Sequence, residues 1–124
     1  MKGKVTGIGG VFFKCADVEA TKAWYKKHLG IDAGDYGATF KAAENQTTAW
    51  SPFKQKTDYL GERDQQFMVN YRVDDLDALM QRLAAADIES IKPIEHYEYG
   101  SFAWVVDIDG RRIELWQPAD ESIL

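Results

Sequence analysis

The chain has 124 residues, a length that suits one compact domain burying about two-thirds of the surface that its unfolded chain exposes. Its 15 Lys and Arg against 20 Asp and Glu give a formal net charge of -5. This acidic balance argues against a nucleic-acid partner, because phosphate neutralisation requires clustered cations. A hydrophobic content of 45% excludes a disordered chain. With one cysteine, Cys15, no apolar run of membrane-spanning length and no secretory signal, we expect a cytoplasmic protein that contacts no membrane.

The first half of the chain predicts a strand, a helix and then short strands. Residues 5–15 are largely apolar with internal glycines, and they predict a strand. Asp17 is an expected N-cap, and the helix that follows should end at Gly30, which can adopt the left-handed C-cap conformation. Between residues 31 and 52, short apolar pieces divided by glycine or polar groups predict two or three strands. The polar stretch 53–65 predicts a linker or mobile loop.

The second half repeats this order. Residues 67–73 predict a strand, and Asp75 is a second expected N-cap. From Leu76 onward, apolar residues at positions i, i+3, i+4 and i+7 predict an amphipathic helix. Further strands are expected over residues 88–94, 102–106 and 112–117, with a hairpin turn at 107–111 between the last two.

The two halves also align with each other. Phe13–Val18 aligns with Tyr71–Leu76, which superposes strand end, cap and helix start. Trp50-Ser-Pro likewise aligns with Trp116-Gln-Pro. Neither half has enough core alone, so the two must pack together. We therefore predict an α+β fold in a single domain over residues 1–124, with module one at about 5–52, a linker loop at about 53–65 and module two at about 66–118.

Three segments carry a family resemblance: Cys15–Gly30, Tyr71–Leu79 and Val106–Trp116. They resemble the vicinal oxygen chelate superfamily, which includes glyoxalase I, bleomycin-resistance proteins, fosfomycin-resistance enzymes and extradiol dioxygenases. The resemblance implies two βαβββ modules that form a half-open, barrel-like sheet, commonly in homodimers. The Asp-Gly-Arg-Arg-Ile-Glu-Leu motif is specific for this fold rather than for one activity, because members share a scaffold and differ in chemistry.

In the metal-dependent members, four inward-facing positions hold the metal, often through two His and two Glu. The resemblance places these positions at Gly10, Thr48, Met68 and Glu114, and the internal repeat pairs Gly10 with Met68 and Thr48 with Glu114. Only Glu114 is a suitable ligand, and one carboxylate cannot hold a divalent ion against water. We therefore expect no cofactor and no metal, with a divalent metal as the alternative.

Glu114 is the candidate catalytic residue, as a general base with a raised pKa or as a hydrogen-bond acceptor for a ligand. Strand alternation points it away from the apolar Ile113 and Leu115, toward the concave side of the sheet. Its alternative role is an outward carboxylate paired with Arg112. Aromatic residues on the same side suit stacking on a flat ligand, and their alternative role is to fill the core. The predicted ligand-binding residues are Phe12, Thr48, Trp50, Met68, Asn70, His96, Trp104 and Trp116.

These features predict a glyoxalase/bleomycin-resistance-like homodimer that binds a small organic molecule in an aromatic-lined, metal-free cavity. The alternative is a lyase or isomerase, similar to lactoylglutathione lyase, that uses Glu114 as acid/base with or without a divalent metal. A third possibility is an accessory module that works through dimer contacts alone. Whether the protein is an enzyme stays open at this point.

Overall fold

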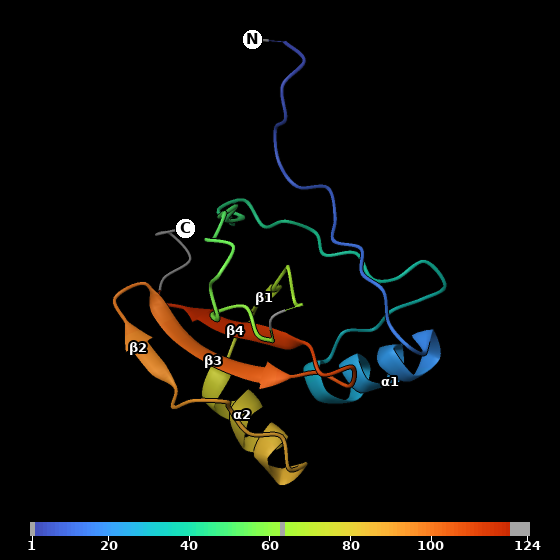
Figure 1. Cartoon of the computed structure of the whole chain (residues 1–124), viewed down its shortest axis with the longest axis vertical. Coiled ribbons are helices and arrows are strands. Elements are labelled where there is room, and N and C mark those ends of the chain that lie inside the picture. The colour runs from blue at the N-terminus through green and yellow to red at the C-terminus, as the bar shows by residue number, and fades with distance from the viewer. Residues whose placement is uncertain (1, 63, 120–124) are drawn as a thin grey trace.

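The computed structural model describes residues 2–62 and 64–119. Its strands form one four-stranded sheet in the order β1-β4-β3-β2, with β1 parallel to β4 and the other neighbours antiparallel (Figure 1). The predicted α+β class is confirmed, and β1, α2, β2, β3 and β4 make up one βαβββ unit. In chain order the elements are α1 (Val18–Leu29), β1 (Asn70–Arg72), α2 (Leu76–Ala85), β2 (Glu95–Tyr97), β3 (Gly100–Val106) and β4 (Arg112–Pro118).

Both helices begin at the predicted caps. The side chain of Asp17 accepts a hydrogen bond from the Ala20 N–H at 3.0 Å, and that of Asp75 accepts one from the Ala78 N–H at 3.0 Å. Gly30 ends α1 in the left-handed conformation with φ 72°, as predicted. In the part of the chain that the structure describes, no helix has the length and apolar character to span a membrane.

The core lies between the two helices and one face of the sheet. Leucines of α2 and Tyr25 of α1 pack against inward residues of β3 and β4, and Figure 1 shows both helices on the same side of the sheet. Because side chains alternate along a strand, the residues of β3 and β4 next to these core positions face the opposite side of the sheet. That second face carries Trp104 and Glu114 and is where the site is found. The buried core residues are Tyr25, Leu76, Leu79, Leu83, Ala103, Val105, Ile113 and Leu115.

The predicted strands of module one do not form. Residues 5–15 and 31–52 are coil outside α1, apart from one isolated bridge between Gly34 and Gly37. Strand propensity alone does not hold a segment in a strand, since the backbone groups and one apolar face need partners. No neighbouring strand supplies them here, among the residues described. The internal repeat is therefore visible in the two helices, and only module two is complete as a sheet.

Two strand boundaries in module two also differ from the prediction. Residues 88–94 form no strand, because Pro93 cannot donate to a ladder, and β2 follows at Glu95–Tyr97 instead. The strand expected at 67–73 is shortened to β1. The side-chain amide of Gln65 donates to the Arg112 carbonyl and accepts from the Arg112 N–H, both at 2.8 Å. A longer β1 would need those same two groups of β4, so Gln65 limits the strand.

Candidate functional site

Glu114 lies near the centre of the sheet face that the helices leave open, with 8% of its surface exposed. Its Oε1 accepts a hydrogen bond from Asn70 Nδ2 at 2.7 Å. Its Oε2 accepts one from Trp104 Nε1 at 2.8 Å and a second from the hydroxyl of Tyr59. All three donors are neutral, and no ion pair formed within the described residues includes Glu114. An ionised carboxylate in this position is an acceptor only.

Tyr59 reaches Glu114 from the loop 53–65. Trp104 Nε1 lies 3.2 Å from its hydroxyl oxygen, and the two rings meet edge to face at 83°. On its other side the Tyr59 ring stacks on Phe53, with ring centroids 5.7 Å apart. Burial, together with the bond to Glu114, raises the pKa of Tyr59 well above its ordinary value, so the hydroxyl keeps its proton at neutral pH.

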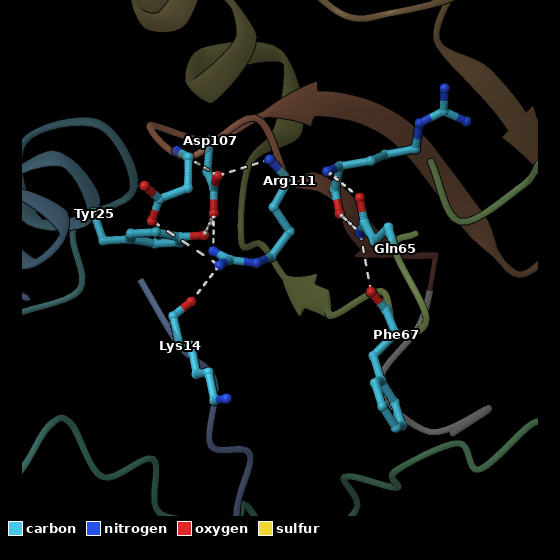
Figure 2. A network of polar contacts seen from close by, with 8 residues as sticks. Lys14, Tyr25, Gln65, Phe67, Asp107 and Arg111 are labelled. Atoms are coloured by element: carbon cyan, nitrogen blue, oxygen red, sulfur yellow. Dashed lines mark hydrogen bonds and ion pairs between the residues drawn. The ribbon is translucent and has the colours of Figure 1, made fainter. Parts of the chain in front are cut away.

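The loop is attached to β4 beside Glu114. The Arg112 guanidinium donates to the carbonyl of Tyr59 at 3.2 Å, and the Gln65 amide pairs with the Arg112 backbone. The same amide donates to the Phe67 carbonyl at 2.9 Å (Figure 2). Gly61 has φ +124°, and a side chain there would collide with the Gln65 amide. These contacts fix where the loop crosses the sheet and therefore where Tyr59 points.

A set of stacked rings continues from Trp104 across the open face. The Phe102 ring is nearly parallel to Trp104, at 6.3 Å and 15°, and to Trp116, at 6.0 Å and 11°. Tyr97 and Tyr99 stack on each other at 5.0 Å, and both meet Phe102 edge-on. We call the five rings of residues 97, 99, 102, 104 and 116 the aromatic face.

Two cations border the aromatic face. The Lys92 ammonium lies 4.1 Å from the centroid of the Trp104 ring, and the Arg72 guanidinium lies 5.1 Å from that of Trp116. Lys92 also pairs with Glu95 at 3.2 Å. Cations over aromatic rings are attracted by the negative ring faces, so both side chains help to hold the rings in place.

Four of the predicted site residues lie together on the open face of the sheet: Asn70, Trp104, Glu114 and Trp116. The strand register pairs Trp104 with Glu114 and Phe102 with Trp116, as expected from the hairpin. Asn70 pairs with Glu114 from the other side.

The other predicted site residues lie elsewhere. Phe12, Thr48 and Trp50 are exposed on coil, and Met68 is half-buried just before β1. His96 pairs with Ser101, and strand alternation therefore places it on the side that carries the helices, where its Nδ1 is 2.8 Å from the Ser101 hydroxyl.

Sequence reasoning missed Tyr59 and Lys92. The loop was recognised as polar, and two aromatic residues within it, Phe53 and Tyr59, were the available signal that it packs on something. Lys92 lies in a segment that the sequence predicts as a strand, and nothing in that pattern indicates a contact with Trp104. Both residues reach the site through long-range packing, which periodicity does not encode.

The four positions that hold the metal in metal-dependent relatives do not fit a divalent ion here. Gly10 has no side chain, Thr48 and Met68 offer a neutral oxygen and a thioether, and both oxygens of Glu114 already accept hydrogen bonds. A hard ion requires several carboxylate or imidazole ligands. Over residues 2–62 and 64–119, no three His, Cys, Asp or Glu side chains converge as a ligand set.

A second polar network, around Asp107, holds the hairpin to α1 (Figure 2). The buried Asp107 carboxylate accepts hydrogen bonds from the Tyr25 hydroxyl at 2.5 Å, from the Arg111 guanidinium at 2.6 Å and from two backbone N–H groups. Arg111 also donates to the Lys14 carbonyl at 2.6 Å. Its groups satisfy one another, so this network is structural.

Two open depressions share Ile91 and Lys92 in their lining. One, of about 430 Å³, is formed by α2 and residues 88–94. The other, of about 420 Å³, is lined by residues that include Tyr59, Lys92 and Arg112. Glu114 and Trp104 line neither of them. Tyr59 therefore fills the space over Glu114 that a ligand would need.

The sequence profile of the Glyoxalase/Bleomycin resistance protein/Dioxygenase superfamily matches residues 7–115. The chain belongs to this superfamily. No curated protein gives a significant match to it.

Solved structures agree with this fold. A glyoxylase/bleomycin resistance protein/dioxygenase domain from Frankia sp. EAN1pec is 16% identical, with a TM-score of 0.55 over 93% of this chain and 99% of that chain. A protein from the mobile metagenome of V. Pseudocholerae is 16% identical, with a TM-score of 0.56 over 94% of this chain and 100% of that chain. TnmS3, an antibiotic binding protein from Streptomyces sp. CB03234, is 24% identical, with a TM-score of 0.51 over 84% of this chain and 88% of that chain.

Proposed function

We propose that this protein binds a small organic molecule on the aromatic face, beside Glu114, without a metal. The observation that carries the proposal is the stack of Trp104, Phe102 and Trp116 next to a buried carboxylate. Flat rings supply a large apolar contact area, and a single polar group fixes the orientation of the ligand. The fold shared with TnmS3, an antibiotic binding protein, supports small-molecule binding as a role for this scaffold.

Glu114 supports binding better than catalysis. A general base needs a free lone pair directed at the proton that it removes. Three donors, from Tyr59, Asn70 and Trp104, already surround this carboxylate. The proposed role of Glu114 is to accept a hydrogen bond from the ligand in place of one of these donors, a role in which no proton is transferred. The lyase or isomerase alternative would require Glu114 to exchange those donors for a substrate proton.

A fluorescence titration tests the proposal. Flat aromatic compounds should quench or shift the tryptophan emission of the native protein and saturate it. By calorimetry, Trp116→Ala should weaken binding by about tenfold, because it removes one face of the stack. Trp24→Phe, on α1 and away from the aromatic face, is the matched control and should bind normally. If no aromatic compound binds, or if both variants lose affinity equally, the proposal fails.

Glu114→Gln separates binding from turnover. If Glu114 serves binding, Glu114→Gln should lower ligand affinity, and neither the native protein nor the variant should convert the ligand. If the native protein converts a substrate and Glu114→Gln abolishes the conversion, the enzyme alternative is correct.

We also propose that two copies of the chain associate and that the protein works in the cytoplasm. Support for association comes from large apolar side chains on the coil segments, including Phe12 at 96% exposure and Trp50 at 78%. Monomeric proteins seldom leave so many large apolar groups in water. A second copy would cover them.

A further inference from the structure

One side chain, Tyr59, makes the contacts that a ligand on the aromatic face would make. Its hydroxyl donates to Glu114, and its ring packs at 6.4 Å against Trp104. The Lys92 ammonium lies over both rings, 5.3 Å from the centroid of Tyr59 and 4.1 Å from that of Trp104. With Tyr59 in place, Trp104 is 2% exposed although it lies on the open side of the sheet.

The loop that carries Tyr59 is held by few bonds. Residues 53–62 belong to no helix or strand. Within them, the Thr57 N–H bonds to the Lys54 carbonyl, the Tyr59 N–H to the Thr57 hydroxyl and the Gly61 N–H to the Asp58 carbonyl. The Arg112 guanidinium holds the backbone of the loop through the Asp58 and Tyr59 carbonyls, but it does not touch the Tyr59 side chain, which can turn about its own side-chain bonds. Tyr59 also lines the open depression of about 420 Å³. Tyr59 can therefore leave Glu114 without any strand pair being broken.

We propose that Tyr59 is an internal stand-in for the ligand, and that the ligand is a small hydroxy-aromatic molecule that displaces it. The inference rests on the proposed binding function and names its ligand class. Glu114 accepts hydrogen bonds and cannot donate while ionised, so the incoming group must be a donor such as a hydroxyl. Trp104 and the Lys92 ammonium both favour an aromatic ring beside that hydroxyl.

The test replaces Tyr59 and supplies its side chain as a free molecule. Tyr59→Ala is titrated with 4-methylphenol, with toluene, which lacks the hydroxyl, and with 4-methylcyclohexanol, which lacks the aromatic ring. The thermal midpoint and calorimetry are the measurements. We expect 4-methylphenol to raise the midpoint and to bind at least about tenfold more tightly than toluene, because a hydrogen bond to a charged acceptor accounts for that factor. It should also bind several-fold more tightly than 4-methylcyclohexanol, which keeps the hydroxyl but loses the aromatic contacts with Trp104 and Lys92.

Two control variants complete the experiment. Tyr36→Ala removes an exposed tyrosine and should gain no binding of 4-methylphenol. Tyr59→Ala combined with Glu114→Gln should lose most of the preference for the hydroxyl. Equal affinities for 4-methylphenol and toluene, or no binding of either, would overturn the inference.

The native protein provides a second readout if Tyr59→Ala does not fold. When 4-methylphenol displaces Tyr59, trypsin should cut after Lys54 and Lys56 several times faster, and toluene should have little effect. An unchanged cleavage rate at saturating 4-methylphenol contradicts the inference.

Failure of this inference and failure of the proposed function give different results. If the native protein binds flat aromatic compounds whether or not they carry a hydroxyl, binding stands and the role of Tyr59 is wrong. If 4-methylphenol binds Tyr59→Ala but no aromatic compound binds the native protein, the pocket under Tyr59 exists and the proposed function fails.

Discussion

Two buried carboxylates, Glu114 and Asp107, have opposite surroundings. Glu114 is held by neutral donors on the open face, whereas Asp107 is held by an arginine as well as by Tyr25 on the helix side. Burial first, and then the bond to Asp107, raise the pKa of Tyr25 far above its ordinary value. The Tyr25 hydroxyl therefore stays protonated in the folded protein after it would ionise in the unfolded chain.

Because the pKa of Tyr25 is higher in the folded protein than in the unfolded chain, we predict that the protein loses stability at alkaline pH. Tyr25 stabilises the fold fully below its unfolded pKa of about 10, and that contribution declines as the pH rises toward its higher folded pKa. Tyr25→Phe should cost about 1–3 kcal/mol at pH 7, from the lost bond to a charged acceptor, and should make the decline above pH 10 shallower. Urea unfolding between pH 7 and 11.5 measures both effects. Tyr36→Phe, at an exposed site, is the control, and identical pH profiles for the two variants would contradict the prediction.

Single-residue reasoning succeeded where local geometry decides the outcome. The position of Glu114 on the open face follows from strand alternation, and its pairing with Trp104 follows from the length of the hairpin turn. Tyr59 could not be placed in this way, because a loop residue has no periodicity that points it to a partner. Its contact with Glu114 depends on where the loop crosses β4.

At the scale of elements, the β2–β3 hairpin depends on Gly100. This residue has φ +131°, and an added Cβ would collide with the Gln117 carbonyl and lie 2.6 Å from Trp116 Nε1. The Trp116 indole in turn donates to the Tyr99 carbonyl at 3.1 Å. Close packing at Gly100 therefore holds both the turn and one ring of the aromatic face.

Gly100→Ala should destabilise the protein by about 1–3 kcal/mol, because it adds backbone strain and a clash. It should also weaken ligand binding, since Trp116 must move. Urea unfolding and calorimetry are the measurements. Gly7→Ala is the matched control, because an added Cβ there meets nothing within 4 Å, and its effect should stay within about 0.5 kcal/mol. If Gly100→Ala leaves the free energy of unfolding unchanged, the hairpin relaxes around the added methyl group and the prediction is wrong.

The helices and the hairpin were predicted correctly because their signals are local. Asp17, Gly30 and Asp75 act within one turn of backbone, and the turn at 107–111 joins strands that are adjacent in sequence. The strands of residues 5–15 and 31–52 depend instead on distant partners. Their apolar pattern shows that they can be buried, but a pattern cannot supply the neighbouring strand.

At the scale of the whole molecule, helices cover one face of the sheet. The coil segments outside the sheet carry exposed aromatic side chains. Figure 1 shows the N-terminal segment leading away from the sheet. The proposed association of two copies predicts a particle of twice the 14.1 kDa chain mass in sedimentation equilibrium. Phe12→Asp should shift the particle toward the single chain, because burying an unpaired carboxylate is costly.

Ile108→Asp is the control for this prediction. Ile108 is also exposed, but it lies in the turn between β3 and β4 and not on the coil segments, so its replacement should leave the mass unchanged. A native protein that sediments as a single chain at micromolar concentration would contradict the proposal. So would a dimer that Phe12→Asp leaves intact.

The pairing of Gln65 with the backbone of Arg112 has one further consequence. In an ordinary strand, an amide proton is shielded from exchange with solvent deuterium by the neighbouring strand. The proton of Arg112 is shielded by a side chain of the loop instead, at 2.8 Å. Its exchange rate therefore follows the docking of that loop, while the Glu114 amide, which is bonded to the Val69 carbonyl, follows the pairing of β1 with β4. Two amides on the same strand thus record separate motions of the molecule.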